Sequence, residues 1–204
     1  MSDRSGHVGF FNWAAPAFGH LGDRWSDEAI ERWCSWLRPH LSADGGSVLD
    51  LGGGTGALAA RLADATGAAV TVLDPTPEML RYLKPHERVT GVIGLAERMP
   101  FGADTFDAVV ISDAFHHFRD QDGAVREVRR VVRPGGALLV LEFDPRGLMR
   151  LIVWGEKLLG EPGAFLTPDA MCAYMATHGI AGHCEKTSPT GYYFLGTVQA
   201  SAPA

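Results

Sequence analysis

The sequence predicts an α/β fold, a three-layer sandwich built around a mostly parallel β-sheet, and three observations support this. Short, continuous apolar segments rich in β-branched residues recur along the chain, as expected of strands buried on both faces. Segments with helical apolar spacing lie between most of them. Glycine, with 25 residues among 204, is concentrated at the junctions between apolar segments. Alternating strands and helices imply βαβ units, whose right-handed crossovers produce a layered parallel sheet.

Five apolar segments are predicted as the buried strands: Ser47–Leu51, Ala69–Leu73, Val89–Ile93, Phe106–Ser112 and Ala137–Phe143. Between them, Ala57–Ala65 and Gly123–Val132 repeat apolar residues at i, i+4 and i+7, which predicts amphipathic helices. Ser26 is a candidate N-cap for a helix that precedes the first strand and runs to about Leu37.

The end of the chain departs from this alternation. Leu148–Leu159 is a bulky amphipathic segment, interpreted as a lid helix, and a second helix is predicted from about Pro168 to His178. Two closing segments, Ala181–Thr187 and Tyr192–Val198, flank a turn-like S-P-T-G and predict an antiparallel hairpin. We therefore expect one domain: an N-terminal lid and helical segment (1–46), a ligand-binding core (47–145), and a substrate lid with the terminal hairpin (146–204).

Composition excludes several classes of protein. The formal net charge of −6 gives no electrostatic reason to expect a nucleic-acid partner. No segment reaches the roughly 18 apolar residues of a transmembrane helix, and the N-terminus lacks the pattern of a secretory signal. The three cysteines (Cys34, Cys172 and Cys184) are irregularly spaced without C-x-x-C, which argues against a disulfide framework and favours the reducing cytoplasm.

A glycine-rich loop follows the first predicted strand and leads directly into a helix, in the segment Val48–Ala57. Glycines let the backbone turn tightly and approach a ligand, and the helix N-terminus offers unpaired N–H groups. The next strand is followed by Asp74, whose carboxylate can accept hydrogen bonds from both hydroxyls of a ribose. In a doubly wound sheet, these features meet in the crevice at the carboxyl ends of the strands.

Two kinds of ligand fit this loop. The spacing Gly52-x-Gly54-x-x-Ala57 satisfies the dinucleotide fingerprint. Counted from Asp50, the same residues satisfy the D-x-G-x-G-x-G pattern of S-adenosylmethionine-dependent methyltransferases. A carboxylate beside the loop suits a ligand with an ammonium group better than it suits a pyrophosphate, which favours the second interpretation.

Three further motifs follow in order: V-L-D-P-T-P-E-M-L (72–80), the segment 96–118 with P-F-G-A-D-T-F-D and D-A-F-H-H-F, and 127–143 with R-P-G-G. Together with the loop they resemble class I S-adenosylmethionine-dependent methyltransferases, in particular the branch with the ubiquinone/menaquinone-biosynthesis C-methyltransferases. The resemblance covers residues 47–145 and implies a Rossmann-like fold. It also implies a seven-stranded sheet in the order 3-2-1-4-5-7-6, with the last strand antiparallel.

The resemblance also implies roles for individual residues. Asp50 and the glycines Gly52, Gly53 and Gly54 would cradle the methionine part of S-adenosylmethionine, and Asp74 would hold its ribose. The remaining cofactor residues that it implies are Pro75 and Met79 against the adenine face, Ala96 and Glu97 at the adenine edge, and Ser112 and Asp113 near the methionine ammonium. Leu95 departs from the family, in which many members have an acidic residue just before this alanine.

The pair His116 and His117 is the candidate for catalysis, as a general base or a substrate-orienting donor. Adjacent side chains diverge too far to chelate one ion readily, and no zinc motif accompanies them, so no metal is expected. His116 is the preferred candidate for facing the pocket, and a packed or capping role remains the alternative for both.

The expected activity is transfer of the methyl group of S-adenosylmethionine to a small-molecule acceptor by in-line displacement, leaving S-adenosylhomocysteine. Aromatic residues expected near the pocket mouth, among them an N-terminal group of Phe10, Phe11 and Phe18, favour an apolar or aromatic acceptor. Two alternatives remain open from the sequence: a non-catalytic protein that binds the cofactor as a sensor or partner subunit, and a nicotinamide-dependent oxidoreductase.

Overall fold

A computed structural model of the chain describes residues 25–146, 164–188 and 190–199. Its strands are β1 (Ser47–Leu51), β2 (Ala69–Asp74), β3 (Val89–Ile93), β4 (Phe106–Ser112), β5 (Val132–Phe143), β6 (Ile180–Lys186) and β7 (Gly191–Val198). Its helices are α2 (Asp27–Leu37), η1 (Arg38–His40), α3 (Ala57–Thr66), α4 (Pro77–Leu80), η2 (Phe115–His117), α5 (Gln121–Val131) and α7 (Pro168–Thr177). The helices α4, η1 and η2 are additional to those that the sequence predicts.

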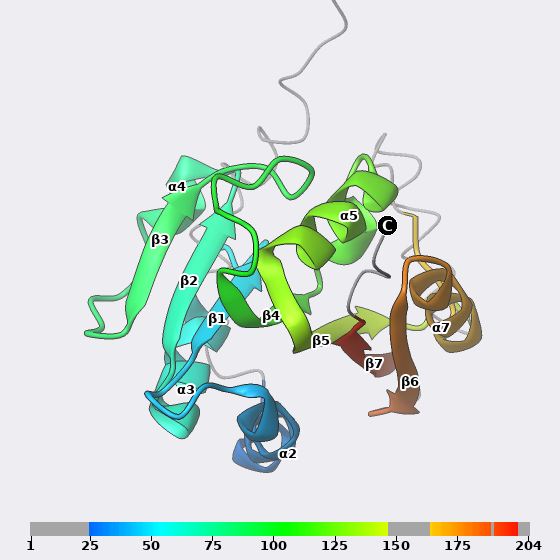
Figure 1. Ribbon diagram of the computed structural model, residues 1–204, viewed down its shortest axis with the longest axis horizontal. Coiled ribbons are helices and arrows are strands. Elements are labelled where there is room, and N and C mark those ends of the chain that lie inside the picture. The colour runs from blue at the N-terminus through cyan, green and yellow to red at the C-terminus, as the bar shows by residue number, and fades with distance from the viewer. Residues whose placement is uncertain (1–24, 147–163, 189, 200–204) are drawn as a thin grey trace, which may run out of the picture.

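The strands form one seven-stranded sheet in the order β3-β2-β1-β4-β5-β7-β6, with β3 and β6 at its two edges (Figure 1). The pairs β3–β2, β2–β1, β1–β4 and β4–β5 are parallel, whereas β7 is antiparallel to both of its neighbours. This confirms the predicted fold class, the strand order and the terminal hairpin.

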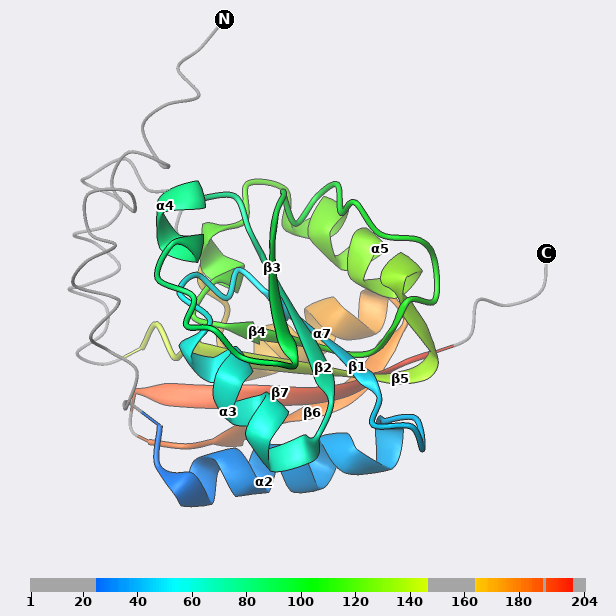
Figure 2. The same cartoon turned by 90° about the vertical axis from the view of Figure 1, so that its left-hand side faces the viewer.

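Helices cover both faces of the sheet (Figure 2). Neighbouring residues of a strand serve opposite faces: Val48 packs in the core with α2 and α3, and Leu49 packs in the core with α5 and α7. Burial on both faces explains why the central strands have continuous apolar runs instead of an alternating pattern. At the start of α2, the Ser26 side chain accepts a hydrogen bond from the Ala29 N–H at 3.2 Å, which confirms the predicted cap.

The predicted start of β5 is wrong, because the strand begins at Val132 and includes the R-P-G-G segment. There the Arg133 side chain is ion-paired with Asp107 of β4 and donates to the His40 carbonyl. A Cβ atom on Gly136 would lie 2.5 Å from the Asp107 carbonyl oxygen, so this close approach requires glycine. The motif therefore joins β5 to β4 at the end of the sheet opposite the glycine loop.

Two predicted segments, the lid helix Leu148–Leu159 and the aromatic N-terminal group, lie wholly outside the described residues. Among the helices within 25–146, 164–188 and 190–199, none combines the length and apolarity needed to cross a membrane.

Candidate cofactor site

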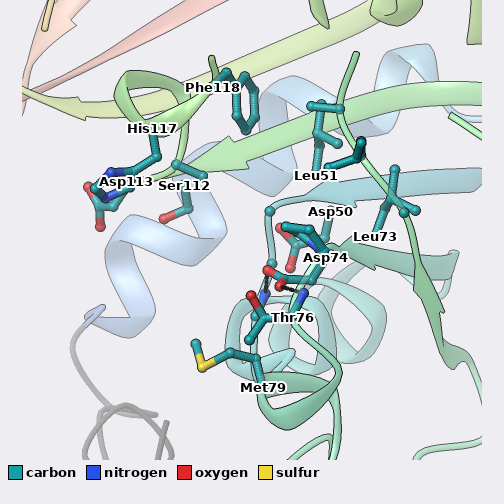
Figure 3. A pocket seen from close by; sticks show the side chains of 18 of the residues that line it. Asp50, Leu51, Leu73, Asp74, Thr76, Met79, Ser112, Asp113, His117 and Phe118 are labelled. Atoms are coloured by element: carbon teal, nitrogen blue, oxygen red, sulfur yellow. Dashed lines mark hydrogen bonds between the residues drawn. The ribbon is translucent and has the colours of Figure 1, made fainter. Parts of the chain in front are cut away.

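A cavity of about 700 Å³ opens at the carboxyl ends of β1, β2 and β4. All but one of the residues that the sequence predicts for the site line it: Asp50, Gly52, Gly53, Gly54, Asp74, Pro75, Met79, Ala96, Glu97, Ser112, Asp113 and His117. The structure adds lining residues that the sequence analysis missed, including Thr76 and the segment 118–120. Figure 3 shows Asp50, Asp74 and Met79 on one side of this cavity and Ser112, Asp113 and His117 on the other.

The glycine loop has a backbone conformation that side chains disfavour. Gly52, Gly54 and Gly56 have φ angles of 74°, 54° and 69°, in the left-handed region. Space is also restricted, since a Cβ atom on Gly52 would lie 2.6 Å from the Ala114 Cβ and one on Gly54 would lie 2.8 Å from the Met79 Cε. The loop therefore presents backbone instead of side chains to the cavity, at the N-terminus of α3.

Asp74 fixes this loop to the end of β2. One carboxylate oxygen accepts the Gly54 N–H at 3.0 Å, and the other accepts the Thr76 N–H at 2.8 Å (Figure 3). Burial raises the pKa of Asp74, and these backbone hydrogen bonds oppose that shift. The Thr76 side chain also hydrogen-bonds to this carboxylate, so three of its roughly four lone-pair sites are used and about one remains for a ligand hydroxyl.

Asp50 is fully buried at the end of β1, with its carboxylate beneath Gly53. Neither of its side-chain oxygens has a partner with normal hydrogen-bond geometry among the described residues. Burial, assisted by the charge of Asp74 and opposed in part by the nearby Ala59 backbone N–H, raises the pKa of Asp50 to about 7. A buried carboxylate without well-placed donors is costly, and a ligand with an ammonium group would compensate this cost. The lining therefore fits S-adenosylmethionine, which has an amino-acid end and a ribose.

The opposite wall is made by the chain that leaves β4. Asp113 has a φ angle of 48°, which is unusual for a residue other than glycine, and its N–H donates to the Leu141 carbonyl at 2.9 Å. Strained backbone of this kind persists where the surrounding structure fixes it, and it concentrates at functional sites. The turn directs the chain into η2, so that His117 and the following Phe118 line the cavity.

Glu97 connects the segment that follows β3 to the loop before α5. Its carboxylate accepts the N–H groups of Arg119 and Asp120 at 3.1 and 3.3 Å. Leu95, the residue that departs from the family pattern, also lines the cavity and is 56% exposed. An apolar side chain there cannot accept a hydrogen bond from a ligand amino group.

The two predicted histidines separate. His117 lines the cavity, whereas His116, the preferred candidate from the sequence, is not among the described lining residues and is only 3% exposed. Its Nδ1 lies 2.8 and 2.9 Å from the two carboxylate oxygens of Glu142, and its backbone N–H also donates to that carboxylate. The His116 ring stacks on Phe165 at a centroid distance of 4.0 Å. Glu142, at the end of β5, carries no local motif, and the sequence analysis did not predict it.

Comparison with known proteins identifies the family of the chain. Residues 49–140 match the family described as "Methyltransferase domain". The chain is 30% identical over 198 residues to the ubiquinone/menaquinone biosynthesis C-methyltransferase UbiE of Shewanella sediminis, covering 90% of this chain and 79% of that protein. The corresponding enzyme of Paracoccus denitrificans is 38% identical over 155 residues, covering 70% and 61% respectively.

Among solved structures, human N-acetylserotonin methyltransferase in complex with S-adenosylmethionine is similar in fold, with a TM-score of 0.73 and 19% identity over 98% of this chain and 61% of that one. An identity this low shows the fold alone, and the relatives in sequence carry the family assignment. The chain therefore belongs to the class I S-adenosylmethionine-dependent methyltransferases, in the branch of the ubiquinone/menaquinone biosynthesis C-methyltransferases.

Proposed function

We propose that this methyltransferase acts on a small, apolar, aromatic acceptor, and that an electron-rich ring of the quinol type is the first class to test. The carrying observation is the cavity at the strand ends, where Asp50 and Asp74 lie together among apolar side chains that include Leu51, Leu73 and Phe118. The names of the relatives, C-methyltransferases of ubiquinone and menaquinone biosynthesis, support a ring carbon as the acceptor atom.

On the cofactor side, we assign Asp50 and the glycine loop to the amino-acid end and Asp74 to the ribose. Met79 supports this arrangement, because its Cε lies close to the Gly54 backbone beside the Asp74 carboxylate. The other cofactor contacts proposed from the family pattern are Pro75, Ala96, Glu97, Ser112 and Asp113, all of which line the same cavity. When bound, S-adenosylmethionine supplies a methyl group activated by its sulfonium centre, and the residues of the chain align donor and acceptor.

On the acceptor side, we assign η2 to the wall of the cavity beside the acceptor. His117 is the histidine that lines the cavity and is therefore the proposed base or orienting group. Glu142 and His116 act behind it, since the carboxylate holds both the backbone and the ring of His116 and so fixes the turn that carries His117. We further propose that 47–145 is the cofactor-binding core, flanked by an N-terminal lid and helical segment (1–46) and by a substrate lid with the terminal hairpin (146–204).

The test measures S-adenosylhomocysteine formation by mass spectrometry with a hydroquinone, the matching oxidised quinone, a phenol and an aliphatic amine. We expect product with the hydroquinone, and a new carbon–methyl bond on its ring by NMR. The matching quinone should be inert, because its electron-poor ring carbons do not attack a methyl donor. Turnover with the amine alone, or methylation of the phenol oxygen alone, would contradict the proposed acceptor class.

A further inference from the structure

Two cysteines that are distant from the cofactor cavity lie in contact at the edge of the sheet. Cys172 is on α7 and Cys184 is on β6, the outermost strand, and the two elements run side by side (Figure 1). Their sulfur atoms are 2.8 Å apart. A disulfide bond is about 2.05 Å long, so the two sulfurs need to approach by less than about 1 Å to reach bonding distance.

Each thiol of the pair acts as a hydrogen-bond donor. The Cys172 S–H donates to the Cys184 sulfur, and the Cys184 S–H donates to the Pro168 carbonyl at 3.1 Å. Burial, followed by the hydrogen bond from Cys172, raises the pKa of the Cys184 thiol. Because the thiolate is the species that attacks a disulfide, the raised pKa slows attack by Cys184 on an oxidant.

The pair is more accessible to solvent than the third cysteine. Cys172 and Cys184 are both half-buried, and the residues that precede Cys184 on β6, 181–183, are exposed. Cys34 is fully buried on α2 and belongs to the core on the other face of the sheet. A small oxidant can therefore reach the pair, and Cys34 is a matched internal control.

We propose that Cys172 and Cys184 are a redox modification site, at which the two thiols form a reversible disulfide that links α7 to β6. With a low-molecular-weight disulfide as oxidant, one thiol displaces one half of that disulfide and gives a mixed disulfide. The second thiol then displaces the other half. Two S–H bonds of the protein and the S–S bond of the oxidant are lost, and one protein S–S bond and two small thiols are formed.

The consequence of the link is local. It closes a loop of 12 residues in sequence separation between the last helix and the edge strand. α7 starts directly after Phe165 and Leu166, which contact His116 and the Tyr192 hydroxyl respectively. Fixing α7 therefore also restrains the segment that packs behind η2.

The test treats the full chain with oxidised glutathione and maps its peptides under non-reducing conditions, for wild type, Cys34→Ser, Cys172→Ser and Cys184→Ser. Wild type and Cys34→Ser should each give one cross-link between the peptides of Cys172 and Cys184. Each cross-linked protein should have lost the mass of two hydrogen atoms and regain it with dithiothreitol. The other two variants should carry a glutathione adduct on the remaining thiol instead.

A second readout is thermal unfolding, in which oxidation should raise the Tm of wild type by roughly 5–10 °C, whereas Cys172→Ser, which carries only the glutathione adduct, should show no rise. Wild type that keeps both thiols free after treatment with oxidised glutathione would overturn the proposal. So would a separate glutathione on each cysteine, or a cross-link that joins two chains.

Discussion

Replacing Asp50 by asparagine should stabilise the cofactor-free protein increasingly as the pH rises, while removing cofactor binding. The Asp50 carboxylate is fully buried with no partner of normal hydrogen-bond geometry among the described residues, and burial, opposed only in part by the Ala59 backbone N–H, raises its pKa from 3.8 to about 7. A raised carboxyl pKa means that the folded state retains a proton that the unfolded chain has lost. The contribution of Asp50 to stability is thus fully present below about pH 4 and is lost as the pH rises through 7.

The magnitude follows from linkage. Each unit of pKa difference corresponds to about 1.4 kcal/mol, and about two units of the shift lie between pH 5 and pH 7. The free energy of unfolding of Asp50→Asn, relative to wild type, should therefore increase by roughly 3 kcal/mol between pH 5 and pH 8. The absolute difference at one pH also contains the cost of burying an amide, so the change with pH is the quantity to compare.

Urea denaturation at pH 5, 6, 7 and 8 without cofactor measures this change. Asp107→Asn is the matched control, because Asp107 is also buried but accepts hydrogen bonds from Ser42 and Ser47 and pairs with Arg133, and its pKa is lowered. Stability from such a group is lost only as the pH falls below about 3.8, so the difference between Asp107→Asn and wild type should stay constant between pH 5 and pH 8. A difference between Asp50→Asn and wild type that stays constant across the range would refute the reasoning.

Three other substitutions test separate parts of the account. Gly54→Ala places a side chain at a φ of 54° beside the Met79 Cε. It should lower the free energy of unfolding by about 1–2 kcal/mol and weaken cofactor binding at least about tenfold. Gly102→Ala, at a glycine without a positive φ, is its control in denaturation and titration. Glu142→Gln leaves a buried N–H of His116 poorly paired. It should lower the free energy of unfolding by about 2–3 kcal/mol and lower kcat. An unchanged urea midpoint together with an unchanged kcat would contradict the role of this pair. Ser26→Ala removes the N-cap of α2 and should cost about 1 kcal/mol in denaturation, whereas Ser35→Ala on the exposed face of the same helix should cost less.

Local patterns predicted the elements, and the family resemblance predicted the order of the strands. The β1 and β4 segments could be recognised because burial on both faces requires continuous apolar residues. The start of β5 could not, since Pro134 and two glycines normally end a strand. That segment is an irregularity in the pairing of β5 with β4, between the pairs Phe106–Val132 and Ala108–Ala137, and Arg133 bonds across it to Asp107 and His40, a contact that appears only after folding.

The site residues also divide into those that the sequence could predict and those that it could not. The glycine loop and Asp74 are adjacent to strand ends in sequence, so their convergence could be predicted from topology. Glu142 could not be predicted, because its partner His116 is 26 residues away and the two meet only through the pairing of β4 with β5. The choice between His116 and His117 depended on the short η2 turn, which no pattern in the sequence indicates.

The most direct test of the account is calorimetric titration of the protein with S-adenosylmethionine, S-adenosylhomocysteine and NAD. Asp74→Ala serves as the site variant and Asp44→Ala, an exposed residue before β1, as the control. We expect wild type and Asp44→Ala to bind the first two ligands at micromolar concentration, and Asp74→Ala to lose this binding while it retains the fold. Binding of NAD alone, or undiminished binding of S-adenosylmethionine by Asp74→Ala, would contradict the assignment of this cavity.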